Sequence, residues 1–138
     1  MRTVILPTVL AGAVMLSGCM DTSGAQLSQQ PQSEPPTNYR PAVLAYARQS
    51  YIDPYSIRDA SISEPLPVRY GLTGSEIVWG VCVRANARNR MGGYTGLQES
   101  LFVFSGNNLD TSRSGVRGSG FACQGAVYTP FPELERLS

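Results

Sequence analysis

Ile77-Val78-Trp79-Gly80-Val81-Cys82-Val83-Arg84 is the stretch of sequence that decides the fold. Side chains alternate between the two sides of an extended strand, so every second residue from Ile77 to Val83 points one way, and the residues between them, Cys82 included, point the other. Both sets are apolar. The pattern therefore predicts a strand that is covered on both faces and lies in the middle of its sheet.

Two more apolar runs are expected to pair with this strand. Residues 101–104 form the first run, and residues 121–128 form the second. The second run places Cys123 on a strand next to that of Cys82, so the two thiols can meet.

The segments between these runs are more polar. Residues 57–63 alternate as a further strand does. Two prolines interrupt residues 64–67, which we expect at a sheet edge or in a loop. Residues 105–120 are rich in Gly, Ser, Asn and Asp, a composition that predicts a long loop.

One helix is expected before the strands. Pro41 suits a first helical turn, and apolar residues recur at helical spacing over residues 41–51 until an Asp-Pro pair ends the pattern. Residues 131–138, with Glu133 and Glu135, are expected to be a solvated end. The predicted fold class is α+β: one N-terminal helix packed on a small, mainly antiparallel, disulfide-closed sheet.

The first residues have the layout of a secretory signal. Arg2 supplies a positive charge, and residues 4–16 carry none, a run shorter than the roughly 20 residues of a membrane-spanning helix. Leu16-Ser17-Gly18-Cys19 then closely resembles the lipobox of bacterial lipoproteins. We expect removal of residues 1–18 and attachment of lipid, palmitate included, to Cys19. The alternative is an ordinary signal peptide with a cysteine at its end.

The residues after Cys19 indicate where the lipid holds the protein. Met20, and not aspartate, follows the cysteine, which resembles the outer-membrane sorting signal of enteric bacteria. Residues 19–38 are mostly polar residues and proline, which cannot bury enough apolar surface to fold, so a flexible tether is expected. Residues 39–138 suffice for one small domain.

The other two cysteines form a pair. Once Cys19 carries lipid, Cys82 and Cys123 remain in an oxidising compartment, where a disulfide is the default expectation. Two buried free thiols are the alternative.

Composition excludes several classes of function. Removal of residues 1–18 takes away one of eleven basic residues, so ten basic residues balance ten acidic ones, and no general attraction to nucleic acid is expected. The chain has no histidine, which excludes a Ser-His-Asp triad. No nucleotide-binding glycine motif is present, and neither a cofactor nor a metal is expected.

Residues 86–96 stand out between the two best strands. Turn chemistry explains their Asn and Gly residues completely, because both residue types accept positive φ at little cost. The sharper interpretation is that Arg88, Arg90 and Tyr94 project from this loop and bind an anionic or sugar-like ligand. Arg113 and Arg117, in the second predicted loop, are expected near them if the disulfide draws the two loops together.

The same region carries a resemblance. Asp53-Pro54-Tyr55-Ser56, Val81-Cys82, Asn86-Ala87-Arg88-Asn89 and Gly92-Gly93-Tyr94-Thr95-Gly96 resemble a group of small exported proteobacterial proteins, many of them lipoproteins, described only as uncharacterised. The resemblance covers residues 46–104. Arg88 stands where lysine is commoner, and Val83 where glycine often follows the cysteine. It implies a shared domain and supplies no activity.

The sequence favours a non-enzymatic binding or interaction module, anchored to a membrane of the cell envelope and engaging another envelope protein or a glycan. A glycan or peptidoglycan hydrolase is the first alternative, with Asp53, Asp59 and Glu64 as its candidate acids and bases. A structural spacer without a partner is the second.

Overall fold

The computed structural model describes residues 30–71, 74–115 and 121–136, so the signal peptide and Cys19 lie outside the described residues. Helix α1 (Tyr39–Ser50) leads into a short 3-10 helix, η1 (Pro54–Ser56). The elements that follow are β1 (Arg58–Ser63), β2 (Leu66–Tyr70), β3 (Glu76–Asn86), β4 (Gln98–Ser105), β5 (Asn108–Gly115), β6 (Tyr128–Pro130) and α2 (Pro132–Glu135).

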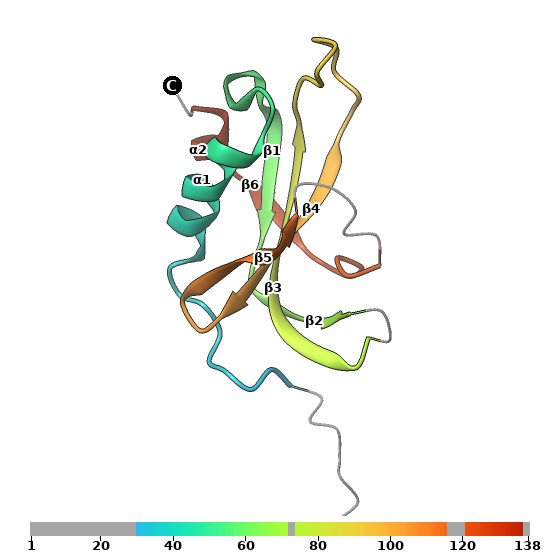
Figure 1. Cartoon of the computed structure of the whole chain (residues 1–138). Coiled ribbons are helices and arrows are strands. Elements are labelled where there is room, and N and C mark those ends of the chain that lie inside the picture. Colours follow the sequence, from blue (N-terminus) through green and yellow to red (C-terminus); the bar gives the residue numbers. More distant parts are fainter. Residues whose placement is uncertain (1–29, 72–73, 116–120, 137–138) are drawn as a thin grey trace, which may run out of the picture.

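The six strands form one antiparallel sheet in the order β5-β4-β3-β1-β6, and β2 also pairs with β3. Strand β3 is central, as its sequence predicts: β4 follows one of its edges, while β2 and β1 pair with successive parts of the other. Both helices lie on the same face of the sheet (Figure 1). The predicted α+β class is confirmed. Within the described ranges, no helix is long and apolar enough to cross a membrane.

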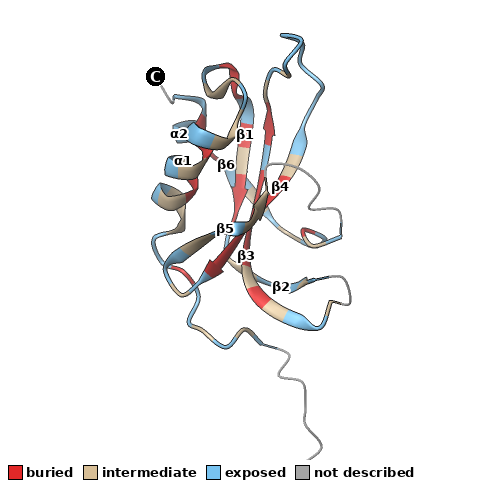
Figure 2. Ribbon diagram, viewed as in Figure 1, coloured by how far each residue is buried: buried red, intermediate tan, exposed pale blue. Residues whose placement is uncertain are grey.

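The main core lies between the helices and the sheet. Alternation along β3 directs Val81 and Val83 into it, and Phe102 of β4, paired with Val81, lies in the same core. Buried stretches of β1 and β3 are red in Figure 2. Val43 and Ala47 of α1 are fully buried against this layer, because residues four apart share one face of a helix. Each fully buried large apolar side chain contributes about 1.5 to 3 kcal/mol.

A smaller core covers the other face of the sheet, around a disulfide between Cys82 and Cys123. The predicted bridge is thus confirmed. Gly80 lies in this face at a point of close approach, where an added Cβ would be 2.8 Å from atoms of Val68 and Leu101. Glycine fits there because a Cβ at this position would force the side chains of Val68 and Leu101 to move.

Residues 121–128 do not form the predicted strand. A turn carries Cys123 over the face of the sheet, and the strand that follows, β6, begins only at Tyr128 and pairs with β1. Ala122 and Ala126 pack on the smaller core with the disulfide. The apolar run therefore reflects a segment lying across a sheet face, which periodicity alone does not separate from a strand.

Residues 108–115, inside the predicted long loop, form strand β5. Gly106, with φ of 57°, and Asn107 make a tight turn that pairs Ser105 with Asn108. Strand β5 lies at the edge of the sheet, where its residues are exposed or only half-buried. Its polar composition therefore resembles that of a loop. The Gly-Asn pair was the signal for the hairpin.

The predicted solvated end is also wrong. Phe131 and Leu134 are fully buried in the main core, and α2 begins between them. Glu135 Oε1 accepts a hydrogen bond from Ala60 N at 2.7 Å, and Glu133 forms an ion pair with Arg40 at 3.1 Å. The C-terminal segment is therefore part of the fold.

The described part of the predicted tether contacts the domain. Ser33 O accepts a hydrogen bond from Trp79 Nε1 at 2.6 Å. Thr37 N and Asn38 N both donate to Asn107 Oδ1, at 2.8 and 3.3 Å. The contacts of the domain thus include Ser33, which precedes the predicted boundary at residue 39.

Candidate functional site

The predicted binding loop is the tip of the hairpin between β3 and β4, at the end of the molecule away from the first described residues (Figure 1). Asn89 closes this tip. Its Oδ1 accepts hydrogen bonds from Met91 N at 2.9 Å and Gly93 N at 3.1 Å, and its own N–H donates to Gly93 O at 2.9 Å. Gly92 and Gly96 have φ of 78° and 91°. Turn chemistry accordingly accounts for Asn89, Gly92 and Gly96, whereas Asn86 belongs to β3.

Ser56 fastens this hairpin to η1. Its Oγ accepts a hydrogen bond from Arg88 N at 2.9 Å, and its backbone oxygen accepts one from Tyr94 OH at 2.9 Å. These bonds join the two segments that carry the resemblance, residues 53–56 and 86–96. We call the surface formed by residues 50–59 and 86–98 the hairpin end.

Two guanidinium groups lie against the ring of Tyr94. Arg58 Cζ is 3.7 Å from the ring centroid, and Arg88 Cζ is 5.4 Å from it. The attraction of a cation for an aromatic face holds both side chains near the ring. Arg58 is placed by an irregularity of β1, where the register shifts before Ser61 and Asp59 has φ of 56°.

A pocket of about 300 Å³ opens in the hairpin end. It is lined by Ser50, Tyr51 and Ile52 after α1, by Ala85, Ala87 and Arg88 at the end of β3, and by Thr95 and Gln98. Burial raises the pKa of Tyr51, whose side chain forms a hydrogen bond with Ser100. Tyr51 therefore contributes an uncharged phenol to the pocket lining. Arg88 thus belongs both to the Tyr94 cluster and to the pocket.

Large apolar side chains are exposed on the hairpin end, and one of them, Ile52, also lines the pocket. Met91 at the hairpin tip is 91% exposed. Ile52, Tyr55 and Leu97 each expose more than half of their surface. Exposed apolar side chains gathered at one place mark binding surfaces more often than single ones do.

Charges at the hairpin end are incompletely paired. Arg58 lies 3.7 Å from Asp59, whereas neither Arg88 nor Arg90 forms an ion pair within the part of the chain that the structure describes. Asn86 Oδ1 is a buried acceptor without a hydrogen-bond partner among the described residues. Arg88 and Arg90 therefore leave the hairpin end able to bind acidic groups of a partner, whereas the buried Asn86 oxygen is out of reach of one.

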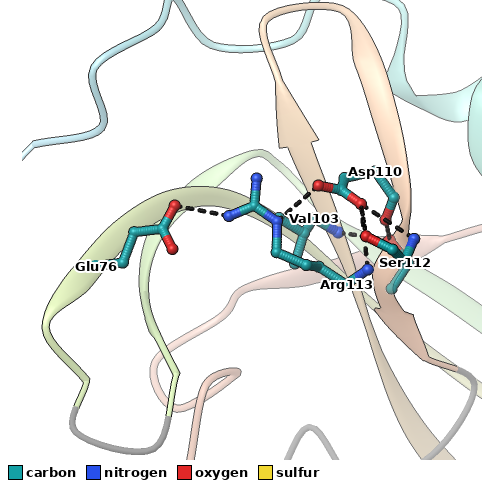
Figure 3. Close-up of polar contacts among 6 residues, drawn as sticks. Glu76, Val103, Asp110, Ser112 and Arg113 are labelled. Atoms are coloured by element: carbon teal, nitrogen blue, oxygen red, sulfur yellow. Dashed lines mark hydrogen bonds and ion pairs between the residues drawn. The ribbon is translucent and has the colours of Figure 1, made fainter.

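Arg113 does not join this cluster, contrary to the prediction. Its Nε is 2.6 Å from Asp110 Oδ2, and its Nη1 is 2.6 Å from Glu76 Oε1 (Figure 3). Both carboxylates raise the pKa of Arg113. The side chain therefore ties β5 to the start of β3, a structural role. Arg117 lies outside the described residues.

Asp110 makes the stability of this tie depend on pH. Hydrogen bonds from Ser112 and Arg113 lower its pKa from the ordinary 3.8 to about 2. Because the unfolded chain takes up this proton first as the pH falls, the stabilisation is complete above pH 4 and is lost between about pH 4 and pH 2. We expect Asp110→Asn to be less stable than the parent at neutral pH, with a difference that shrinks towards pH 2.

Urea unfolding at a series of pH values checks this expectation. Glu34→Gln, which changes an exposed carboxylate, is the matched control, and its free energy of unfolding should equal that of the parent at every pH. A difference between Asp110→Asn and the parent that stays constant down to pH 2 would contradict the assigned role.

Two of the three carboxylates of the hydrolase alternative, Asp59 and Glu64, are not gathered in one site. Asp59 and Glu64 lie near opposite ends of β1, separated by roughly 16 Å of extended strand, whereas paired carboxylates of glycosidases lie roughly 5 to 9.5 Å apart. Glu64 accepts a hydrogen bond from Tyr39 OH at 3.0 Å, and Asp53 precedes η1. In the described ranges, no three metal-binding side chains come together.

Sequence reasoning found Arg88 and Tyr94 but missed their supports. Arg58 and Ser56 bring the two segments of the hairpin end together. Ser56 was visible as part of the Asp53-Pro54-Tyr55-Ser56 motif, which had no assigned partner. Arg58 had no signal, because its position depends on the irregularity of β1.

Comparisons of the chain with protein-family models, with curated proteins and with solved structures found no match. The resemblance to small exported proteobacterial proteins therefore stays a prediction. The function of the hairpin end is accordingly inferred from its contacts, charges and shape.

Proposed function

We propose that the protein is a non-enzymatic binding module, anchored in the cell envelope by lipid on Cys19, that engages another envelope component through the hairpin end. The observation that carries the proposal is the placement of Arg88. Its side chain lies against Tyr94 and in the pocket wall, and it forms no ion pair within the described residues.

The place of the hairpin end in the molecule fits an anchored protein. The described chain begins at the opposite end of the domain (Figure 1). A lipid attached through residues 19–29 therefore leaves the hairpin end free to face away from its own membrane. An outer-membrane location is part of the proposal, and it rests on Met20.

Lipid attachment is tested by Cys19→Ala. We expect this variant to lose palmitate labelling and to leave the membrane pellet, because two or three acyl chains are what hold the protein there. Ser23→Ala, a nearby polar position, is the control and should be labelled like the parent. Continued labelling of Cys19→Ala would contradict the anchor.

Binding is tested by Arg88→Ala combined with Arg90→Ala in the lipidated protein. Chemical crosslinking in intact envelopes, followed by affinity capture, should recover at least about tenfold less of the partner, because a charge-assisted contact contributes about 1.5 to 3 kcal/mol. Sedimentation with isolated peptidoglycan covers the case of a glycan partner.

Two further variants make this test selective. Arg69→Ala, on β2 at a distance from the hairpin end, should behave like the parent. Tyr94→Phe loses the hydrogen bond to Ser56 but keeps the ring, so it should weaken capture less than the arginine variant. The spacer alternative predicts that all of these chains behave alike, and that result would refute the proposed function.

A further inference from the structure

The hairpin end carries features that select among the classes of partner, and we infer that it binds an acidic, partly apolar segment of a protein. The inference rests on the proposed function, because it names the partner of the same site. Three observations carry it: an arginine lies over the ring of Tyr94, aliphatic side chains are exposed on the hairpin end, and Arg88 and Arg90 form no ion pair within the described residues.

The contacts of Tyr94 disfavour a sugar stacked on its ring. Sugars bind proteins largely by stacking their C–H groups on free aromatic faces. Arg58 lies 3.7 Å above the Tyr94 ring and Arg88 lies 5.4 Å from it, while the hydroxyl is bonded to Ser56. This tyrosine therefore positions arginines and does not offer a free stacking surface.

The exposed side chains of the hairpin end suit a protein. Three of its five large exposed hydrophobic residues carry aliphatic or thioether side chains, namely Ile52, Met91 and Leu97. Methionine, tyrosine and arginine are enriched in protein interfaces, and flexible methionine adapts to the shape of an incoming side chain. The pocket, at about 300 Å³, accepts one or two apolar side chains.

The arginines of the hairpin end indicate which charge the partner carries. Arg88 borders the pocket and Arg90 lies at the tip, so a carboxylate next to an inserted apolar side chain would meet a guanidinium fork. Because Asp59 pairs with Arg58, the positive charge left for a partner is that of Arg88 and Arg90 on the hairpin, and it directs one kind of contact. Aspartate or glutamate beside Leu, Ile or Val is the partner chemistry that fits both features.

A site-specific photocrosslinker tests the inference in the full-length lipidated protein in intact cells. Benzoylphenylalanine is placed at Leu97 in one strain and, as the control, at Val127 in another. Both residues are exposed, but Val127 lies outside the hairpin end. We expect a discrete protein adduct from position 97 that is absent from position 127. Mass spectrometry then identifies the crosslinked segment.

Charge reversal decides whether the contact is the one inferred. Arg88→Glu should reduce the adduct by about tenfold, while Arg69→Glu should leave it unchanged. Changing the acidic residue of the crosslinked segment to arginine should restore the adduct with Arg88→Glu. This rescue distinguishes a direct ion pair from a general loss of folding.

The other outcomes overturn the inference in distinguishable ways. An adduct that muramidase digests, or one with lipid, would show a different partner at the same site, so the proposed function would stand and the inference would fail. A protein adduct that Arg88→Glu does not reduce would also refute the inference. No adduct from position 97 would refute both.

Discussion

Replacing both Cys82 and Cys123 with alanine is expected to lower the free energy of unfolding by about 4 kcal/mol. The bridge joins residues separated by 41 positions, and in the chain-entropy model a closed loop of that size restricts the unfolded chain by about this amount. For a domain of about a hundred residues, the loss corresponds to roughly 15 to 30 °C in Tm. The bridge also holds the turn around Cys123 against the face of the sheet that carries the smaller core.

Urea unfolding of the mature chain measures this effect, with Cys19→Ser in every chain so that no third thiol interferes. The parent after reduction is the matched control, because it keeps both cysteine side chains and lacks only the bond. Reduction should lower the free energy of unfolding of the parent to nearly that of the double alanine variant, and it should leave the free energy of unfolding of that variant unchanged. Equal stability of the oxidised parent and the double variant would contradict the expected contribution.

Phe131→Ala is expected to cost about 3 to 5 kcal/mol of stability. Phe131 has no exposed surface and packs in the main core with residues of α1, β1 and β3. Its replacement removes the transfer free energy of a large aromatic ring and leaves a cavity that the surrounding core fills only in part. The backbone N–H of residue 131 also donates a hydrogen bond to Ala60 O at 2.9 Å. Because this bond keeps the C-terminal segment beside β1, the segment cannot move far enough to fill the cavity left by the missing ring.

Phe121→Ala provides the matched control for this prediction. The same substitution is made ten positions earlier, where the phenylalanine is 87% exposed, and we expect a change within about 0.5 kcal/mol. Thermal and urea unfolding of the two variants measures the contrast. A loss below about 1 kcal/mol for Phe131→Ala would show that the C-terminal segment does not contribute to the core.

The elements that the sequence predicted well are those whose pattern is local. The helix needed only its proline start and its apolar spacing, and α1 covers Tyr39–Ser50 as a result. The central strand needed only apolar residues on both sides, and β3 covers Glu76–Asn86. In β3 both faces that the pattern marked as apolar are buried, whereas α1 buries Val43 and Ala47 and leaves Arg48, part of the predicted face, exposed.

The elements that were mispredicted depend on contacts distant in the sequence. Strand β5 is polar and exists because β4 offers it an edge. The segment around Cys123 is apolar but crosses the sheet instead of joining it. Phe131 and Leu134 look like part of a polar tail until α1 and β1 provide the cavity that they fill.

The candidate site divides in the same way. Residue type alone selected Arg88, Arg90 and Tyr94, because guanidinium and phenol groups in a loop are binding groups in many proteins. The structure decided what each one does: Tyr94 positions arginines, Arg88 borders a pocket, and Arg113 belongs to a separate structural tie.

The sequence by itself determined the fold class, the central strand and the pairing of Cys82 with Cys123, because each follows from periodicity or from counting residues along one chain. Only the tertiary structure decided that residues 50–59 and 86–98 form one surface. The physical reason is that this surface is held by hydrogen bonds that Ser56 accepts from residues 32 and 38 positions away and by an irregularity in β1 that positions Arg58. Such contacts leave no periodic pattern in the amino-acid sequence.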